Sequence, residues 1–315
     1  MRSSSRRQFQ IGAGAALALA AVSPRLTLGQ IQPSGRTRLI LLGTAGGPRP
    51  RKSRASPAQV ILVNNAAYVV DCGNGVAIQL VRAGVSLSTV RHVFITHQHS
   101  DHNADYGNLL LLAWESGLQN RVDTWGPPPL AHMTSLFFEM NAYDMKTRIS
   151  DEGRVPLVPL VHPHEITESG VVTKDENVTV TSVLVEHPQV TPAFAYRFDA
   201  KDRSIVVSGD TRRSDALIRL ARGADVLVHE VLYPSAIDRL VAPLPNATAL
   251  KKSILSHHTP AEDVGRVADA ADVKTLVLSH FVPAEDTSLT DQMWIDAVRS
   301  TYKGRIIIGR DLLEI

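Results

Sequence analysis

The segment FITHQHSDH, residues 94–102, constrains this chain more than any other feature of its sequence. Three histidines and one aspartate occupy six consecutive positions directly after a short apolar run. Because side chains alternate along an extended segment, His97 and His99 are predicted to lie on one side. A turn after them would aim Asp101 and His102 at a second point nearby. Imidazole nitrogens and carboxylate oxygens are ligands that zinc and similar first-row ions prefer, so this segment predicts a metal site.

Three further candidate ligands, His187, Asp210 and His280, stand near the ends of predicted strands, where functional loops usually begin. Each has an ordinary structural alternative. A single histidine at a strand end usually forms hydrogen bonds, and Asp210 alone has the sequence context of a helix N-cap. The cluster at 94–102 favours the metal interpretation. One ion needs three or four ligands, whereas the combined set is large enough for two ions that share one carboxylate.

Apolar runs and alternating segments predict strands in both halves of the chain, with helices between them. The predicted strands are residues 38–43, 59–63, 67–71, 93–96, 177–185, 193–198, 204–208, 225–230, 275–280 and 305–309. The predicted helices are residues 76–83, 108–116, 131–139, 214–221 and 260–271. This order favours two packed sheets covered by helices, an α+β fold of the αββα four-layer sandwich class. Residues 36–315 are predicted to form one domain.

Residues 1–30 have a different character. The pair Arg6-Arg7 precedes a short, Ala-rich apolar run over residues 11–22, which is the order of an export signal, and the run is too short to span a bilayer. The arginine pair with Phe9 two positions on resembles the twin-arginine signature. We therefore expect transit through the twin-arginine export machinery, a location in the periplasm or otherwise outside the cytoplasm, and no stable membrane anchor. The alternative is an N-terminal membrane anchor.

The net charge gives no support for nucleic acid as a partner. The full chain carries a formal charge of +2, but residues 1–30 contain four arginines and no acid. Removal of this segment takes the formal charge from +2 to −2. A weakly acidic chain has no global attraction to phosphate backbones.

Cys72 is the only cysteine, which excludes an intrachain disulfide. Hydrophobic residues make up 44 % and charged residues 20 % of the chain, a composition that supports a sizeable core. Stability is therefore expected from that core and from bound metal. In the stretch VVDCG, Cys72 is interpreted as a small buried residue at a strand end, with a nucleophile or metal ligand as the alternative.

The segment at 94–102 matches the His-x-His-x-Asp-His motif of the metallo-β-lactamase fold. Other blocks of this chain resemble motifs of the ribonuclease Z and arylsulfatase-like branch of that family. They are LGTAGGP at 42–48, DCGNG at 71–75, SGDT at 208–211, ADVLVHE at 224–230 and LVLSHF at 276–281. The resemblance covers nearly all of residues 36–315 and implies a metallo-hydrolase with the αββα fold.

The resemblance implies two bound zinc ions, with manganese or iron as alternative metals. Carried over by motif, the ligands of one ion are His97, His99 and His187, those of the other are Asp101, His102 and His280, and the bridge between them is Asp210. His187 is preferred to His162 and His164 because EHPQVTPAFAYR at 186–197 resembles the family's block in which a histidine precedes an Ala/Gly-Tyr-Arg strand. The other two histidines are predicted to lie on a loop.

Two ions would lower the pKa of a bridging water enough to supply hydroxide near neutral pH, for attack on phosphorus, sulfur or a carbonyl carbon. Asp101 is expected to ligate one ion while it orients this hydroxide. By resemblance, His258 passes a proton to the leaving group, with His257 as its rival and capping of the next helix as the alternative for both. His229 and Glu230 are predicted either to relay protons or to form a buried ion pair.

The most basic window after the first thirty residues is PRPRKSR at 48–54. It follows a glycine loop at 43–47, and turn geometry explains that loop as well as phosphate binding does. Arginine matches sulfate or phosphate oxygens with two hydrogen bonds, so Arg49, Arg51 and Arg54 are predicted to bind an anion close to the metals. The alternative is a solvated basic surface.

Several substrate classes remain open. Ribonuclease Z carries a long arm between the block at 186–197 and the SGDT block, whereas here only residues 199–203 separate two predicted strands. We therefore expect no nucleic acid and a small-molecule substrate, a sulfate or phosphate ester as in arylsulfatase-like and phosphodiesterase-like relatives. A lactone or β-lactam carbonyl is the first alternative, and a non-hydrolytic metal-binding protein or iron oxidoreductase is the second. A homodimer is a further possibility.

Overall fold

The computed structural model describes residues 35–315, which fall within one compact unit. The predicted export signal, residues 1–30, lies outside the described residues. Within the described range, no helix is both long and apolar enough to cross a membrane.

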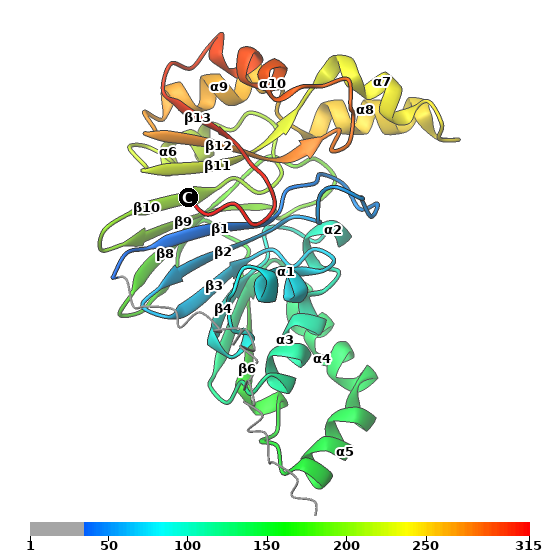
Figure 1. The fold of residues 1–315 in the computed structure, drawn as a ribbon, viewed down its shortest axis with the longest axis vertical. Coiled ribbons are helices and arrows are strands. Elements are labelled where there is room, and N and C mark those ends of the chain that lie inside the picture. The colour runs from blue at the N-terminus through cyan, green and yellow to red at the C-terminus, as the bar shows by residue number, and fades with distance from the viewer. Residues whose placement is uncertain (1–34) are drawn as a thin grey trace, which may run out of the picture. The chain divides into compact units, whose positions relative to one another are not determined.

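Two sheets form the centre of the fold (Figure 1). The first has six strands that neighbour one another in chain order: β1 (Arg38–Gly43), β2 (Ala58–Val63), β3 (Ala66–Val70), β4 (Val90–Phe94), β5 (Val122–Gly126) and β6 (Val161–Glu165). The second has seven strands whose spatial order also follows the chain: β7 (Gly170–Lys174), β8 (Val178–Leu184), β9 (Phe194–Ala200), β10 (Ser204–Val207), β11 (Val226–Leu232), β12 (Thr275–Val282) and β13 (Arg305–Ile308). Strands β3 to β6 and β10 to β13 run parallel, which brings their carboxyl ends to a common edge in each sheet.

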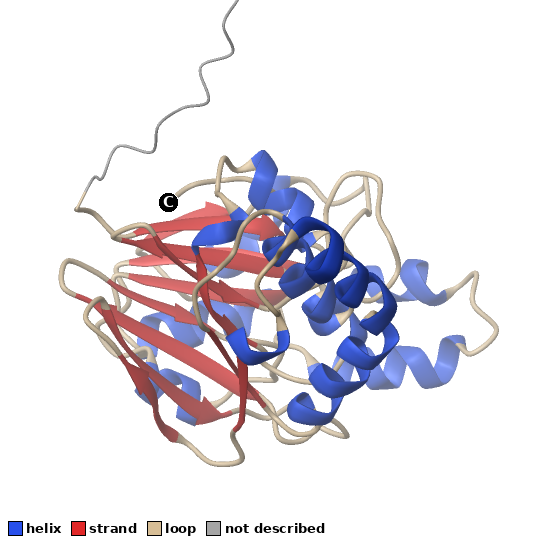
Figure 2. Ribbon diagram, turned by 90° about the horizontal axis from the view of Figure 1, so that it is seen from below, coloured by secondary structure: helices blue, strands red, loops and turns tan. Residues whose placement is uncertain are grey.

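Helices surround the strands (Figure 2). On the first sheet pack α1 (Val76–Arg82), α3 (Tyr106–Glu115), α4 (Leu130–Met140) and α5 (Ala142–Glu152). On the second sheet pack α6 (Asp215–Leu220), α9 (Ala261–Ala270) and α10 (Asp291–Arg299). The remaining elements are α2 (Ser100–Asn103), the neighbouring helices α7 (Ile237–Val241) and α8 (Ala247–His257), and the short 3₁₀ turns η1 (Leu87–Thr89), η2 (Val158–Leu160) and η3 (Pro234–Ala236).

Strand β1 shows why the inner strands are continuous apolar runs. Leu39 and Leu41 belong to the core between the two sheets. Ile40 and Leu42 belong to the core between the first sheet and its helices, because alternate residues point to opposite faces. A strand that is buried on both faces needs apolar residues at every position. Cys72 is fully buried in the same helix-side core, as predicted.

Aromatic side chains join the two sheets. The ring centroid of Phe94, on β4, lies 5.4 Å from that of Tyr196 and 5.2 Å from that of Phe198, both on β9. Burial of a large apolar side chain stabilises a fold by about 1.5–3 kcal/mol. The core between the sheets and one helix-covered core on each outer face make four layers, which confirms the predicted αββα sandwich.

The apolar pattern gives little signal for β5, β6, β7, α5, α8 and α10, which were not predicted. Of these elements, β6 and β7 are sheet edges and the helices lie on the surface, whereas β5 is an inner strand of only five residues. No residue of α8 is buried, and β7 is exposed or half-buried throughout. A segment that buries little apolar surface has no strong periodicity to detect.

The prediction of a loop for His162 and His164 is wrong, because both lie in β6. This strand is the edge of the first sheet, where Pro163 is tolerated because one side of the strand has no neighbour in the sheet. His164 Nε2 lies 2.6 Å from Asp123 Oδ1, and the His164 ring stacks on Trp125 at 4.0 Å. His164 therefore supports the sheet edge.

Candidate metal centre

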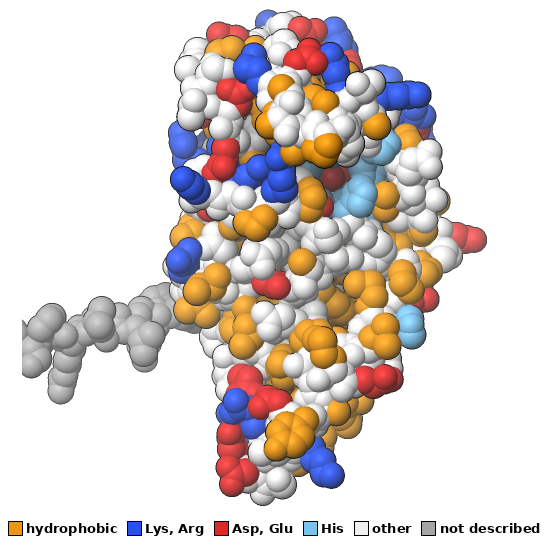
Figure 3. Space-filling model, turned by 90° about the vertical axis from the view of Figure 1, so that its right-hand side faces the viewer, with side chains coloured by type: hydrophobic (Ala, Val, Ile, Leu, Met, Phe, Trp, Pro, Cys, Tyr) orange, Lys and Arg blue, Asp and Glu red, His pale blue; other side chains and the backbone are white. Residues whose placement is uncertain are grey.

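The histidine segment lies where the parallel strands of the first sheet end. His97 and His99 follow β4, and α2 begins immediately afterwards at Ser100. This short helix is the turn that the sequence predicts, and it contains Asp101 and His102. Figure 3 shows His side chains gathered at the surface on one face of the molecule.

His97, His99, His187 and Asp210 form the first cluster, and one nitrogen or oxygen of each lies within 4.8 Å of the others. His97 Nε2 and His187 Nε2 each lie 3.1 Å from His99 Nδ1. Asp210 Oδ2 lies 3.8 Å from His97 Nε2. Three ring nitrogens and a carboxylate oxygen that converge this closely resemble the ligand set of a tetrahedral zinc site.

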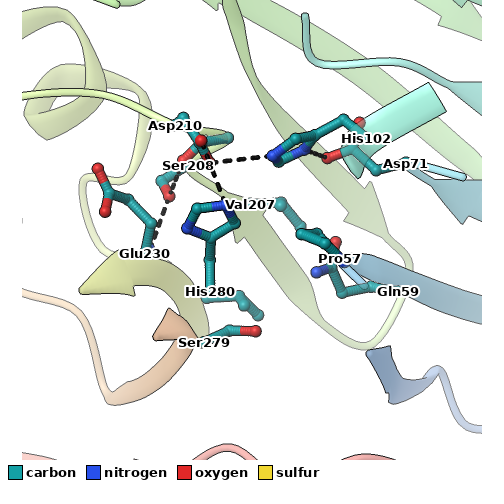
Figure 4. Close-up of a pocket in the computed structure, with 12 residues that line it drawn as sticks. Pro57, Gln59, Asp71, His102, Val207, Ser208, Asp210, Glu230, Ser279 and His280 are labelled. Atoms are coloured by element: carbon teal, nitrogen blue, oxygen red, sulfur yellow. Dashed lines mark hydrogen bonds and ion pairs between the residues drawn. The ribbon is translucent and has the colours of Figure 1, made fainter. Parts of the chain in front are cut away.

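Asp101, His102 and His280 form the second cluster. The carboxylate of Asp210 approaches two of its members (Figure 4): Oδ1 lies 3.3 Å from His102 Nε2, and Oδ2 lies 3.2 Å from His280 Nε2. Asp101 Oδ2 lies 3.6 Å and 3.5 Å from the same two nitrogens. Asp210 therefore takes part in both clusters, as a bridging ligand must.

Buried polar atoms test whether metal ions fit here. His102 Nε2, His280 Nε2 and Asp210 Oδ1 have no hydrogen-bond partner among residues 35–315, although these residues are at most 5 % exposed. An unpaired polar group in a protein interior costs about 1–3 kcal/mol. Coordination of divalent ions would satisfy all three atoms. The residues present therefore fit two metal ions.

The charge state of three of these residues matches what a metal requires, neutral imidazole and ionised carboxylate. Burial and the neighbouring His102 hold the pKa of His97 well below its usual value. Burial lowers the pKa of His187 to about 4. Burial alone would raise the pKa of Asp210, but His280 and His102 outweigh it and hold this pKa well below its usual value.

Asp71 orients His102 from behind (Figure 4). Its Oδ2 accepts a hydrogen bond from His102 Nδ1 at 2.7 Å, and its Oδ1 accepts one from the backbone amide of Thr96 at 2.8 Å. This contact directs His102 Nε2 toward Asp210. Burial would lower the pKa of His102, but Asp210 and Asp71 outweigh it and raise this pKa well above its usual value. A metal ion held by Nε2 would replace the proton there. The DCGNG motif contains Asp71, yet no sequence pattern predicts this contact.

His280 reaches the centre through an irregularity in β12. Glu230 of β11 pairs with Ser279, and the next residue, Val231, pairs with Phe281, so His280 is an extra residue in the ladder. Its φ of 45° lies in the left-handed region, which is strained for a histidine. Such bulges re-aim a side chain next to active sites.

The glycine loop at 43–47 packs against the centre. Gly47 N donates to Asp101 Oδ2 at 3.0 Å, and Gly46 N donates to the carbonyl of Phe281 at 3.1 Å. A Cβ on Gly46 would lie 2.8 Å from that carbonyl oxygen and 2.9 Å from His280 Nδ1, so glycine is required at this position. The loop thus holds one oxygen of Asp101 in place.

His258 and Glu230 stand beside Asp210. His258 Nδ1 donates to Glu230 Oε2 at 3.2 Å and lies 4.0 Å from Asp210 Oδ2. Burial would lower the pKa of His258, but Glu230 and Asp210 outweigh it and raise this pKa to about 9. Glu230 Oε1 in turn accepts hydrogen bonds from the backbone amides of Thr211 and Thr259, each at 3.1 Å. Glu230 is therefore fixed, and it fixes the ring of His258.

A profile of the family described as Beta-lactamase superfamily domain matches residues 67–281. The chain belongs to the β-lactamase superfamily. Its two-sheet sandwich is the metallo-β-lactamase fold of that superfamily.

Ribonuclease Z proteins are among the homologues of this superfamily member. The Ribonuclease Z of Mycobacterium bovis (strain BCG / Pasteur 1173P2) is 32 % identical over 280 residues, which cover 88 % of this chain and 97 % of that protein. The Ribonuclease Z of Mycobacterium marinum (strain ATCC BAA-535 / M) is 30 % identical over 280 residues, with the same coverage of 88 % and 97 %. These relatives bear against the expectation that nucleic acid is no partner.

Solved structures share the superfamily fold. The metallo-beta-lactamase fold protein YhfI from Bacillus subtilis matches with a TM-score of 0.65 at 18 % identity, over 89 % of this chain and 98 % of that chain. Human tRNase Z, short form, matches with a TM-score of 0.64 at 20 % identity, over 88 % of this chain and 98 % of that chain. At such identities the likeness concerns the fold alone.

The structure brings all seven predicted ligands of the superfamily site into two clusters that share Asp210. That they hold zinc stays a prediction. His257 contributes differently from His258: its carbonyl accepts a hydrogen bond from His187 Nδ1 at 3.3 Å, while its ring nitrogen Nδ1 lies 3.3 Å from Ser253 Oγ. His257 therefore supports the centre through its backbone and through its ring, which packs edge-on against that of His187 with centroids 5.1 Å apart.

His229 is fully buried, and its Nδ1 donates to the Glu230 carbonyl at 2.7 Å. Its side chain lies on the face of β11 that carries Leu227, whereas the side chain of Glu230 lies on the face that carries Val228. The predicted relay between these two side chains thus has no side-chain contact to support it within the described part of the chain.

Arg54, one of the three predicted anion-binding arginines, is occupied by the fold. Its Nη1 donates to Thr44 Oγ1 at 2.6 Å and to the Gly309 carbonyl at 2.9 Å. Its guanidinium also lies 4.3 Å from the ring centroid of Phe281. Arg54 therefore ties the basic window to the second sheet and has few donors left for a substrate.

Proposed function

We propose that this protein is a dinuclear zinc hydrolase of small sulfate or phosphate esters. The observation that carries the proposal is the position of Asp210, whose two oxygens lie 3.3 Å from His102 Nε2 and 3.2 Å from His280 Nε2 while the first cluster shares the same carboxylate. Membership of the β-lactamase superfamily supports metal-dependent hydrolysis. Phosphate and sulfate esters suit two neighbouring ions, because both the attacking and the leaving oxygen develop charge.

Two bound ions would supply Lewis-acid activation of water at neutral pH. The residues that would hold them are His97, His99 and His187 for one ion, Asp101, His102 and His280 for the other, and Asp210 for both. Gly47 N fixes one oxygen of Asp101, which limits rotation of that carboxylate. Asp71 keeps the ring of His102 in one orientation.

His258 is the residue best placed to give a proton to the leaving oxygen. It stands beside Asp210, and Glu230 holds its Nδ1, which leaves Nε2 as the second donor. Protonation of a leaving oxygen by a positioned side chain contributes about 10²–10⁴-fold to rate. The neighbouring His257 lacks this placement, because its ring packs on His187 and forms no ion pair with Asp210 or Glu230 within residues 35–315.

A substrate panel together with metal analysis tests the proposal. We expect hydrolysis of 4-nitrophenyl sulfate or bis(4-nitrophenyl) phosphate by protein in which elemental analysis finds two zinc ions per chain. Faster turnover of a lactone or of a chromogenic cephalosporin would move the assignment to carbonyl substrates. Bound iron without hydrolysis would favour an oxidoreductase, and full activity after chelation would remove the metal mechanism.

Cleavage of RNA is a second candidate, favoured by 32 % identity to Ribonuclease Z over 97 % of that protein. In the described structure only residues 201–203 join β9 to β10, so this connection is a tight hairpin and not an arm. Because the identity favours RNA and the short hairpin does not, precursor tRNA belongs in the substrate panel. Asp210→Ala protein is the control for contaminating nuclease. Cleavage that outpaces hydrolysis of the small esters would make RNA the substrate.

We also propose that residues 1–30 direct export through the twin-arginine route. The support is the order of the sequence, with Arg6-Arg7 ahead of the Ala-rich run over 11–22. Replacement of both arginines by lysine should leave the precursor in the cytoplasm, which cell fractionation and immunoblotting detect. Normal export of that variant would refute the twin-arginine assignment.

A further inference from the structure

A cleft beside the candidate metal centre contains three arginines. It has a volume of about 380 Å³ and is bounded by the basic window at 48–54, by α7 and by the segment after β12. Figure 3 shows Lys and Arg side chains next to the exposed His side chains. The charged residues that line the cleft are Arg49, Arg51, Arg239, Glu285 and Asp286.

The two acids of the cleft differ in their partners, which are neutral groups for Glu285 and an arginine for Asp286. Glu285 Oε1 accepts hydrogen bonds from the backbone amide of Ser53 at 2.7 Å and from its hydroxyl at 2.9 Å. Asp286 Oδ2 accepts one from Arg239 Nε at 2.9 Å. Arg239 and Asp286 therefore neutralise each other, and neither serves the remaining two arginines.

The guanidinium groups of Arg49 and Arg51 bring two positive charges to the cleft, which the carboxylate of Glu285 offsets only in part. Neither forms a salt bridge with any residue of 35–315, and the buried Nε of Arg51 has no hydrogen-bond partner in that range. Burial, followed by the like charge of Arg49, lowers the pKa of Arg51 and outweighs the opposite effect of the Glu285 and Asp101 carboxylates. Two like charges held together, one of them half-buried, are unfavourable until an anion joins them.

Arg51 lies close to the candidate metal centre. A Cβ on Gly47 would lie 3.9 Å from Arg51 Nη2, and Gly47 N donates to Asp101 Oδ2 at 3.0 Å. A single residue thus separates this guanidinium from a carboxylate of the second cluster. The arginine pair and the second metal cluster are therefore distinct sites that lie on either side of Gly47.

We propose that Arg49 and Arg51 bind a second anionic group of the substrate, a carboxylate, phosphate or sulfate that a short linker joins to the scissile ester. This inference rests on the proposed ester hydrolase function. Within the basic window it assigns substrate binding to Arg49 and Arg51 and a structural role to Arg54, because Thr44 and Gly309 hold Arg54 by hydrogen bonds. Substrates with one anionic group use the metal centre alone, and substrates with two also use the arginine pair.

Three 4-nitrophenyl phosphodiesters that differ only in their alcohol test this subsite. The propyl ester has one anionic group, and the 3-carboxypropyl and 3-phosphonopropyl esters have a second one. We expect wild-type KM to be about tenfold lower for at least one of the latter two, because hydrogen bonds to charged groups contribute this much. Comparison of the 3-phosphonopropyl ester with the 3-carboxypropyl ester shows whether the arginine pair favours a tetrahedral anion over a carboxylate.

The double variant Arg49→Ala, Arg51→Ala should bind all three esters with the same KM and should keep the wild-type kcat for the propyl ester. Arg219→Ala is the matched control, because it removes an exposed arginine from α6, on the second sheet. This control should retain the wild-type preference for a second anionic group. An equal loss of preference in the control would overturn the proposal.

Charge reversal shows that lost preference does not come from lost folding. Arg51→Glu should prefer a 3-aminopropyl ester to the 3-carboxypropyl ester, a reversal of preference that a misfolded variant would not show. If Arg51→Glu still prefers the carboxylate, the second anionic group binds elsewhere and the proposal is wrong.

Failure of this inference is distinguishable from failure of the proposed function. Equal wild-type KM values for the three esters would overturn the subsite and leave ester hydrolysis standing. If wild-type protein hydrolyses none of the esters, crystals soaked in selenate decide the matter. An anomalous peak between Arg49 and Arg51 that is absent from the double variant supports the subsite, and no peak in wild-type crystals overturns it.

Discussion

Replacement of Asp71 by asparagine tests the contact that orients His102. Asparagine has the shape of aspartate, but its amide nitrogen is a donor. Asp71 accepts hydrogen bonds from His102 Nδ1 and from the backbone amide of Thr96, so either orientation of the new amide sets one N–H group against another. His102 can accept the new N–H only by moving its own proton to Nε2, the nitrogen that faces Asp210.

The magnitude follows from these contacts. An unpaired buried donor costs about 1–3 kcal/mol. Loss of the partner behind a metal-binding histidine weakens metal affinity about 10–100-fold, which equals about 1.4–2.7 kcal/mol. Both estimates therefore predict a similar loss of metal-binding free energy. It should fall on the ion held by Asp101, His102 and His280, while the ion at the first cluster keeps its affinity.

Competition with a chromophoric zinc chelator measures the two affinities. We expect Asp71→Asn protein to give up one ion at about 10–100-fold lower chelator concentration than wild-type protein, and the other ion at an unchanged concentration. Asp175→Asn is the matched control, because Asp175 also accepts side-chain and backbone hydrogen bonds, from Tyr68 and Val178, but contacts no member of the two clusters within the described chain. Two ions held with wild-type affinity in Asp71→Asn would refute the reasoning.

Five other substitutions have definite expected outcomes. Asp210→Ala should lower metal content and turnover together, and elemental analysis that still finds two ions would show that the bridge is misassigned. His258→Ala should lower kcat about 10²–10⁴-fold at unchanged metal content, whereas His257→Ala should lower it less; equal losses would deny His258 a distinct role. Asp123→Asn should lower the free energy of unfolding at pH 7 by about 1 kcal/mol. Burial alone would raise the pKa of Asp123, but hydrogen bonds from Arg121 and His164 outweigh it and hold this pKa at about 2 in the folded protein. The ionised Asp123 carboxylate contributes this stability fully above the pKa that it has in the unfolded chain, near 4, and the contribution is lost as pH falls toward 2. The difference in unfolding free energy between wild-type and Asp123→Asn protein, measured in urea, should therefore shrink over that range. A difference that stays constant would contradict this assignment. Phe94→Ala should cost about 3–5 kcal/mol in urea unfolding, and a loss below about 1 kcal/mol would mean that the core between the sheets repacks.

Local spacing predicts most of the histidine cluster. Residues 94–102 need only strand alternation and one short turn to aim their side chains, and the structure has β4 followed by α2 at this place. Strands such as β1 and β12 are likewise predictable, because burial on both faces leaves a long apolar run. The fold class follows from the order of such strands and helices.

Contacts between distant segments are a different matter. The choice among His162, His164 and His187 depends on which strands end at the metal centre, and β6 places the first two at a sheet edge. Arg51 and Arg54 lie three positions apart in one basic window, yet only Arg54 is bound by the second sheet. Tertiary packing decides which histidine reaches the centre and which arginine is bound, and the spacing of residues along the chain does not predict that packing.

Each sheet supplies part of the candidate metal centre. The histidine segment follows β4 of the first sheet, whereas Asp210 follows β10 and His280 lies on β12 of the second. Ions bound between them would act as cross-links, and thermal resistance would rise with free metal concentration through mass action. Under the proposed export route the chain crosses the membrane already folded, so the metal pool of the compartment in which it folds, and not that of the compartment in which it works, would decide which element it carries.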